Sequence, residues 1–457
     1  MRALKLPHKR QAWLCLALLC SACMYFYWGR IPHDSELTPA PVGSIRAKPL
    51  TDLFQPWFGS RELFLHHLDP YGPAVTREIQ VAFYGRELNL SEVAEAQRFA
   101  FAYRFSYPLY VVFFFAPTIG MQFRTAQIVV WCLLAAVTAW SVLLWLRAVE
   151  IRLSVVALVA FYAVVMTSLP VMQGLNLRQP GLLVAALIAG AAASAVSGRL
   201  FLAGALLALA TIKPQLALLP IAWFGLWVSG EWRLRRNVVW GFAAILAALV
   251  ISSEFFLPAW PMRFLGALRA YATYAGGGSN VGMFLPGRLK WLVCALIAFA
   301  TASFCWRERG RRADSVSFAL ALALVLDLSV LTMPTVIAPY NYVLLLPAAL
   351  LVIGHWNGLW AGTIATRAAA AFCCTLALLP WLLAVVFTLG QSVWPGRLVA
   401  LRSVPAFAGL GLPFAAFGLL FLLRRMAAPA SKRISVGPDS GGAELQDSTI
   451  CKDQFCG

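Results

Sequence analysis

Apolar segments long enough to enter a lipid bilayer follow one another through most of this 457-residue chain. The hydrocarbon core of a bilayer is about 30 Å thick, and an α-helix crosses it in about 20 apolar residues. Backbone groups find no water there, which favours helices that satisfy their own hydrogen bonds. Hydrophobic residues make up 61% of the chain and charged residues only 12%. The sequence therefore predicts an all-α polytopic membrane protein with about 10–13 transmembrane or half-spanning helices.

The basic residues lie in short clusters between the apolar segments, and the net charge is +18. Such clusters are typical of cytoplasmic loops, and residues 307–312 are the clearest example. They indicate membrane topology and contact with anionic lipid headgroups, and they do not indicate nucleic-acid binding. The first apolar segment, residues 12–28, ends in aromatic residues and lacks a small-residue cleavage site. It is therefore predicted to be a retained first span.

Five parts of the chain are predicted from these patterns. They are a cytoplasmic N-terminus (1–11), a first transmembrane helix (12–28), an extracytoplasmic loop with amphipathic helices (29–106), a transmembrane bundle (107–423) and a cytoplasmic, disordered tail (424–457). In the loop, residues 51–68 have helical periodicity, and Ser91 and Glu92 open a second short helix. Residues 107–118 are apolar but too short for a full crossing, which predicts a half-helix.

Lys213 and Pro214 interrupt an apolar segment that extends from residue 200 to residue 228. Basic residues flank both ends of the segment, so we expect two short helices whose Lys-Pro tip points outward. An ammonium group in an apolar segment is costly, and it usually faces a cavity or a partner such as a phosphate. The alternative is that the Lys213 side chain extends to the membrane surface.

Asp52 opens the first predicted amphipathic helix of the extracytoplasmic loop. One interpretation is a general base that takes a proton from an attacking hydroxyl group. The other is a structural N-cap, because Gln55 has the spacing of its reciprocal capping partner. The two roles do not exclude each other.

The remaining polar candidates are ambiguous. Asp327 lies in an apolar segment, where it could neutralise Lys213 or an arginine, or could face the site. A predicted outer loop, residues 173–180, carries Gln173, Asn176 and Arg178, which are either site residues or ordinary solvated residues. Residues 258–286 are predicted to form a second outer loop. His66 and His67 are weak evidence for a metal, and no zinc motif, nucleotide-binding glycine loop or nucleophile elbow occurs in the sequence.

Several of these residues lie in segments that resemble the membrane glycosyltransferases of the GT-C superfamily. The sequence is most similar to glycosyltransferase family 87, the polyprenyl-phosphate-mannose-dependent α-mannosyltransferase type. The most specific segment is residues 203–215, which ends in Thr211-Ile212-Lys213-Pro214-Gln215. The looser similarities are residues 51–54, 68–71, 103–108, 173–176 and 339–342, and in total they extend from about Asp52 to Pro347.

The resemblance implies a GT-C-like bundle that uses a sugar carried on a polyprenyl phosphate, presented at the outer face of the membrane. The acidic residue that is the catalytic base in the superfamily falls on Asp52, and the reaction would invert the anomeric centre. Because the loop before Asp52 is long, Asp69 is a second candidate for the base. Lys213 and Arg178 would bind the donor phosphate, and the further site candidates are Gln173, Asn176, Gln215, Asp327 and Tyr340.

The implied partners are the polyprenyl-phosphate sugar, a lipid or glycan acceptor, and the lipids of a bacterial inner membrane. No metal ligands are predicted, although Asp52 could share a divalent cation with phosphate. A rival interpretation is a transporter or flippase of lipid-linked sugars, which would use the same lysine without a base and would show pseudo-symmetric halves. A third is a non-enzymatic subunit of an envelope-assembly complex. The transferase requires that Asp52 and Lys213 meet.

Overall fold

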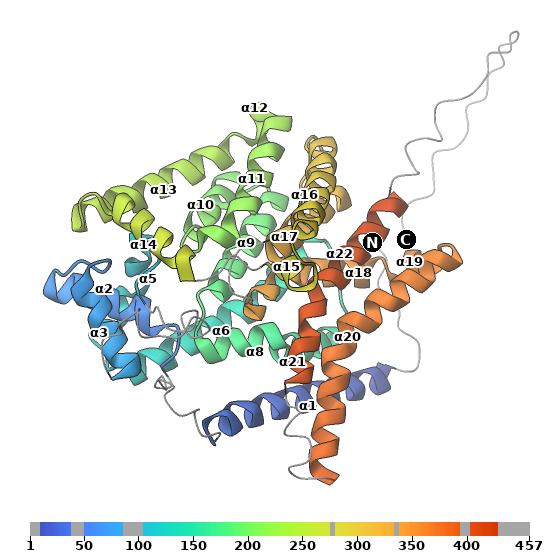
Figure 1. The fold of residues 1–457 in the computed structure, drawn as a ribbon. Coiled ribbons are helices and arrows are strands. Elements are labelled where there is room, and N and C mark those ends of the chain that lie inside the picture. The colour runs from blue at the N-terminus through green and yellow to red at the C-terminus, as the bar shows by residue number, and fades with distance from the viewer. Residues whose placement is uncertain are drawn as a thin grey trace, which may run out of the picture.

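The computed structural model describes residues 10–37, 50–85, 104–274, 279–332, 338–393 and 403–427. Every regular element in these ranges is a helix (Figure 1), which confirms the predicted all-α fold. The predicted helix at Ser91 and the predicted tail after residue 427 lie outside the described ranges.

Five helical segments are long and apolar enough to cross a membrane, and the chain is therefore a multi-pass membrane protein. The bent pair α7 and α8 forms a sixth such segment if its two helices, which meet at 53°, are counted as one span. Shorter apolar helices accompany these spans, as predicted. The six segments are α6 (Phe123–Ala148), α7 (Val155–Met166) with α8 (Leu169–Leu177), α13 (Asn237–Phe256), α16 (Leu289–Glu308), α20 (Ile364–Val393), and α21 (Val404–Ala408) with η5 (Gly409–Gly411) and α22 (Leu412–Ala427).

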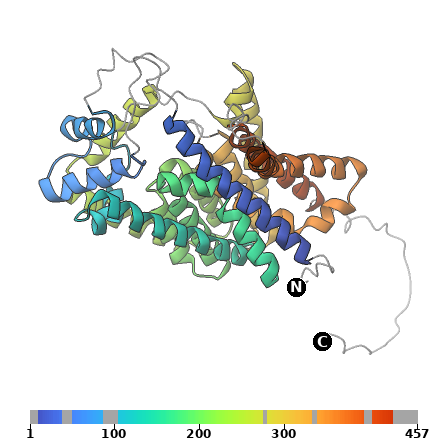
Figure 2. The same ribbon diagram turned by 90° about the horizontal axis from the view of Figure 1, so that it is seen from below.

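The helices of the predicted extracytoplasmic loop lie at one end of the molecule. In both views α2 (Phe54–His66) and α3 (Pro73–Tyr84) lie beside α14 (Trp260–Tyr274), and α20 lies at the opposite end (Figures 1 and 2). Aromatic contacts hold this end together, since the ring of Phe64 lies 5.1 Å from that of Phe256. The first helix, α1 (Arg10–Leu37), packs against α7 and α20.

Short apolar helices form where the sequence predicted a half-helix. Residues 107–118 contain η1 (Leu109–Val111), α5 (Val112–Phe115) and η2 (Ala116–Thr118) in place of one crossing helix. The indole of Trp57 in α2 donates a hydrogen bond to the carbonyl of Thr118, at 3.1 Å. This contact fixes α2, and with it the turn that carries Asp52, on the bundle.

Two regions predicted as outer loops are helical instead. Residues 173–177 belong to α8, and residues 258–286 contain α14 and α15 (Asn280–Phe284). In α14, Trp260 and Ala267 are buried while Met262 and Arg263 are exposed, so this helix is amphipathic. The loop predictions were wrong because an amphipathic or short helix lacks the continuous apolar pattern of a span.

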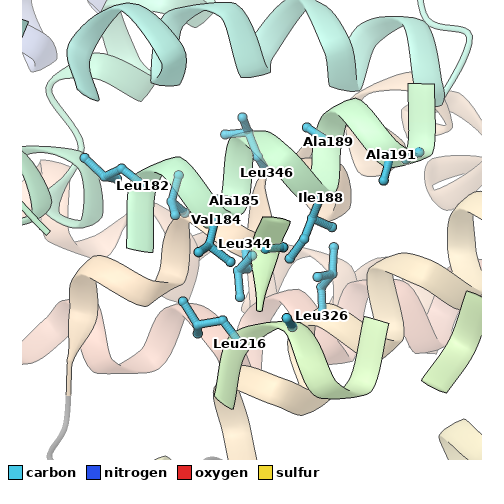
Figure 3. Close-up of a cluster of buried hydrophobic side chains, with 14 of the residues drawn as sticks. Leu182, Val184, Ala185, Ile188, Ala189, Ala191, Leu216, Leu326, Leu344 and Leu346 are labelled. Atoms are coloured by element: carbon cyan, nitrogen blue, oxygen red, sulfur yellow. The ribbon is translucent and has the colours of Figure 1, made fainter. Parts of the chain in front are cut away.

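The small residues of α9 (Gly181–Val196) place this helix at the centre of the packing. Most of its residues are buried, and glycine and alanine allow neighbouring helices to approach closely. Figure 3 shows three leucines from other elements against it: Leu216 of α11 (Pro214–Gly230), Leu326 of α17 (Val316–Thr332) and Leu344 of η3 (Pro339–Leu345). These contacts position α9 relative to α11, α17 and η3.

Backbone contact joins α10 (Leu200–Ala210) to α13. A Cβ atom on Gly204 would lie 1.9 Å from the carbonyl oxygen of Val238, and one on Gly241 would lie 2.0 Å from that of Phe201. No side-chain rotation relieves a clash with backbone. The crossing therefore requires glycine at both positions, and it anchors the helix that leads to Lys213.

We expect Gly204→Ala to lower the free energy of unfolding by about 1–3 kcal/mol, because α10 and α13 must separate. The measurement is thermal unfolding of the detergent-solubilised protein, followed by tryptophan fluorescence. Gly225→Ala in α11 is the matched control, because an added Cβ there has no atom within 4 Å. Equal unfolding temperatures for the two variants would contradict the close helix crossing.

Candidate active site

Asp52 and Lys213 are connected by the amide group of a third residue, Gln179. The Nε2 atom of Gln179 donates a hydrogen bond to Oδ2 of Asp52. Its Oε1 atom accepts one from Nζ of Lys213, at 2.7 Å. Gln179 is 3% exposed and Lys213 is 5% exposed. The structure thus brings the carboxylate and the ammonium group that the sequence singled out into one hydrogen-bonded chain, in which Gln179 and Lys213 are buried and Asp52 is partly buried.

The position of Lys213 follows from the break in its apolar segment. α10 ends at Ala210, and α11 begins at Pro214, whose missing N–H costs nothing at the start of a helix. Lys213 precedes that proline in a non-helical conformation, with φ −124° and ψ 81°. The predicted pair of short helices is confirmed. The alternative in which the lysine reaches the membrane surface is wrong, since its ammonium group is buried against Gln179.

The carboxylate of Asp52 does not cap a helix. The N-cap residue of α2 is Leu53, which is itself in a helical conformation, and no side chain caps that end. Leu53 is fully buried, and Asp52 lies in the turn before it, with its carboxylate bonded to Gln179. The structural N-cap interpretation is therefore wrong.

Burial controls the protonation of Asp52. Loss of solvent raises the pKa of the carboxyl group above its ordinary value, while the hydrogen bond from Gln179 and the positive charge of Lys213 act in the opposite direction. A carboxylate in this environment is a stronger proton acceptor than one in water, and the two neighbours keep its ionised form accessible.

Tyr340 encloses Lys213 from another side. The Nζ atom lies 4.8 Å from the centroid of the Tyr340 ring, a cation–π distance. The backbone N–H of Tyr340 donates to Oε1 of Gln173, at 2.9 Å, so Gln173 of α8 supports η3. A Cβ atom on Gly181 would lie 3.5 Å from Nζ of Lys213 and 3.2 Å from Oδ1 of Asn341. Of the predicted candidates, Tyr340 thus adjoins the lysine and Gln173 is bonded to the backbone of Tyr340.

Asp69 lies apart from this hydrogen-bonded chain. Its carboxylate forms an ion pair with Arg263 of α14 and also accepts the backbone N–H of Tyr71, at 2.9 Å. The Asp69 carboxylate therefore links α14 to the loop between α2 and α3.

The other candidates have separate surroundings. Arg178, in a left-handed conformation with φ 54°, donates to the backbone carbonyl of Asn176 within its own turn. Gln215 is exposed. Asp327 in α17 is fully buried, and neither of its carboxylate oxygens accepts a hydrogen bond from the described residues. The interpretation that Asp327 neutralises Lys213 is wrong, because the ammonium group is bonded to Gln179.

Gln179 is the site residue that the sequence did not single out. It belongs to the polar segment 173–180, but a neutral amide next to Pro180 carries no charge or motif that would mark it. Its role depends on the fold, because Asp52 lies 127 positions earlier in the chain. The only available signal was its place in a short polar segment between two apolar ones.

No group of three or more His, Cys, Asp or Glu side chains gathers within the part of the chain that the structure describes. Of the histidine pair, His66 is bonded through Nδ1 to Glu62, at 2.7 Å. The charged groups of the Gln179 network are therefore one carboxylate and one ammonium group.

Several helices that are long and apolar enough to cross a bilayer define the class of this protein, a multi-pass membrane protein. The family model of glycosyltransferase family 87 matches residues 105–334. The chain belongs to this family of GT-C membrane glycosyltransferases. The matched region contains Gln179 and Lys213 and begins after Asp52. No curated protein and no solved structure matches the chain.

Proposed function

We propose that this glycosyltransferase moves a sugar, with mannose favoured, from a polyprenyl phosphate to an acceptor hydroxyl group on the outer side of a bacterial inner membrane. The observation that carries the proposal is the chain of hydrogen bonds from Asp52 through Gln179 to Lys213. It combines a proton acceptor with a cation suited to phosphate in one buried place.

The reaction assigns one step to each charged group. Asp52 takes the proton of the acceptor hydroxyl group, and the hydroxyl oxygen bonds to the anomeric carbon of the sugar. The bond from that carbon to the phosphate oxygen breaks, and Lys213 stabilises the negative charge on the departing lipid phosphate. An inverting displacement needs the base and the leaving group on opposite sides of the carbon. The amide of Gln179, which separates Asp52 from Lys213, is consistent with that arrangement.

The distribution of basic residues supports an outer location for this site. Arg199 lies just before α10. After α11, Arg233 lies in the short helix α12 (Trp232–Arg235) and Arg236 is the C-cap residue of α12. They occupy the end of the α10–α11 pair opposite to Lys213, and basic residues favour the cytoplasm. The two chain termini would then also be cytoplasmic.

The test supplies radiolabelled donors to proteoliposomes that contain the full chain and an envelope lipid extract as acceptor. We expect transfer from polyprenyl-phosphate mannose, with an inverted linkage in the product, and none from the matching nucleotide sugar. Polyprenyl-phosphate arabinose tests the choice of sugar. Transfer from the nucleotide sugar in liposomes free of polyprenyl phosphate would contradict the donor class. Label that crosses the bilayer while still attached to its donor would favour the transporter.

Removing the amide of Gln179 should shift the pH dependence of this reaction. The base must be ionised, so activity falls as the pH drops through the pKa of Asp52. Gln179→Leu removes a donor that lowers this pKa, and the acid limb of kcat/KM should therefore move to higher pH. Gln173→Leu is the control, because Gln173 is bonded to Tyr340 and not to the carboxylate. An acid limb that stays in place in Gln179→Leu would argue against Asp52 as the titrating group.

A further inference from the structure

A groove of about 390 Å³ follows α9 on the side where α6 and α10 flank it. Its walls are apolar and include Trp140 and Leu144 of α6, Leu187 and Gly190 of α9, and Leu202 and Leu206 of α10. Trp140 is 62% exposed and Leu202 is 42% exposed. The groove is thus open to the lipid that surrounds the bundle.

Small residues of α9 make the floor of the groove. Ala186, Gly190 and Ala193 line it at helical spacing, between the larger side chains of Leu183 and Leu187 on the same face of α9. A Cβ atom on Gly190 would lie 3.0 Å from a methyl group of Leu206 and 3.8 Å from one of Leu144. Leu206 and Leu144 therefore pack closely over Gly190. The predominantly apolar walls of the groove suit a hydrocarbon chain.

Two arginines line the same groove, and both belong to one end of it. Arg147 lies in the last turn of α6, and Arg199 directly precedes α10. Both are exposed. The side chain of neither forms an ion pair or a hydrogen bond with another described residue. Two cations without a carboxylate beside an apolar channel are complementary to an anion that carries an apolar chain.

The arginine end is far from the Gln179 network. Gln179 lies just before the first residue of α9, and Arg199 lies just after the last. The helix between them has 16 residues, which at 1.5 Å per residue is roughly 24 Å. A lipid phosphate that contacts Lys213 cannot also lie between the two arginines.

We propose that this groove binds an anionic phospholipid of the leaflet opposite the Asp52 site. The phosphate lies between Arg147 and Arg199, and one acyl chain follows the groove past Trp140. Such a lipid packs against α6, α9 and α10 together, and α9 and α10 carry Gln179 and Lys213 at their other ends. The site is separate from the donor site and does not depend on the proposed function.

Native mass spectrometry of the full chain in detergent tests this site, with phosphatidylglycerol, phosphatidylcholine and polyprenyl phosphate as probes. We expect the wild type to retain phosphatidylglycerol over phosphatidylcholine. The double variant Arg147→Gln/Arg199→Gln should retain it about 25-fold less, because each arginine near a membrane surface contributes about fivefold in affinity. The matched control is Arg152→Gln, an exposed arginine that does not line the groove. It should retain the lipid normally.

A second pair of variants tests the acyl-chain part of the groove. Trp140→Ala should weaken retention, while Trp131→Ala should not, since Trp131 is 41% exposed on the same helix but is not part of the groove wall. This pair, with Arg147→Lys/Arg199→Lys, decides the question if the double glutamine variant does not fold. The double lysine variant keeps both charges and should retain phosphatidylglycerol.

Three results would overturn the proposal. One is equal retention of phosphatidylglycerol and phosphatidylcholine by the wild type. Another is a loss in Arg152→Gln as large as in the double glutamine variant, which would mean a general surface-charge effect. The third is displacement of phosphatidylglycerol from the arginines by polyprenyl phosphate, which would make the donor lipid the occupant.

Discussion

Asp52→Asn should reduce sugar transfer by about 10²- to 10⁴-fold, the contribution typical of a positioned general base. Asparagine has nearly the shape of aspartate, and its carbonyl oxygen can still accept the hydrogen bond from Gln179. It cannot accept the proton of the acceptor hydroxyl group. The loss should therefore fall on the chemical step, which single-turnover transfer from saturating polyprenyl-phosphate mannose measures directly.

Asp69→Asn is the matched control for that variant. The Asp69 carboxylate is bonded to Arg263 and to the backbone of Tyr71, apart from the Gln179 network. We expect a much smaller loss of activity, caused by a weaker contact between α14 and the α2–α3 loop. The opposite ranking of the two variants would move the base to Asp69, the second candidate that the family resemblance left open.

Lys213→Met should lower kcat by about 10²- to 10³-fold, in line with the loss of one group that stabilises developing charge. Methionine preserves the length and the apolar stem of the side chain but removes the ammonium group. The Oε1 atom of Gln179 then loses its donor, and the departing phosphate loses its cation. The KM for the donor should rise as well, because the same charge attracts the phosphate before the reaction. Kinetics over a range of donor concentrations separate the two effects.

Lys290→Met controls for the loss of a lysine that lies over an aromatic ring. Lys290 lies 5.4 Å from the ring centroid of Trp291, much as Lys213 lies over Tyr340, but it belongs to α16. Its replacement should leave kcat within a factor of about two, since an exposed cation–π contact is worth only about 0.5–1 kcal/mol of stability. A kcat for Lys213→Met in that same range would remove the lysine from the proposed chemistry.

Much of the fold could be predicted because the bilayer limits what an apolar segment can do. Segment length separated the full crossings from the short helices between residues 107 and 118, and Pro214 located the break between α10 and α11. Prediction was poorer for short and amphipathic helices. The sequence predicts outer loops where α8 and α14 form, since neither helix has a long apolar sequence of its own.

The candidate site was predicted only in part, for a similar reason. Charged residues in apolar segments are conspicuous, so Lys213 and Asp327 could be found by inspection, while Asp52 was indicated by its place at a predicted amphipathic helix and by the family resemblance. The residues that contact these charged groups could not be predicted. Asp327 is buried without a hydrogen bond from the described residues, and the partner of the other two is an uncharged amide. Nothing in a local pattern distinguishes such an amide from a solvated one.

The sequence alone determined that this chain enters a membrane as helices and that one of its apolar segments breaks at Lys213. It also determined that few charged residues lie inside the apolar segments. These properties follow from the local cost of placing polar groups in hydrocarbon. Only the tertiary structure decided that Asp52 and not Asp69 is joined to the lysine, and that Gln179 makes the connection. That choice depends on how closely the small residues of α9 and α10 let distant segments pack, which no single segment specifies.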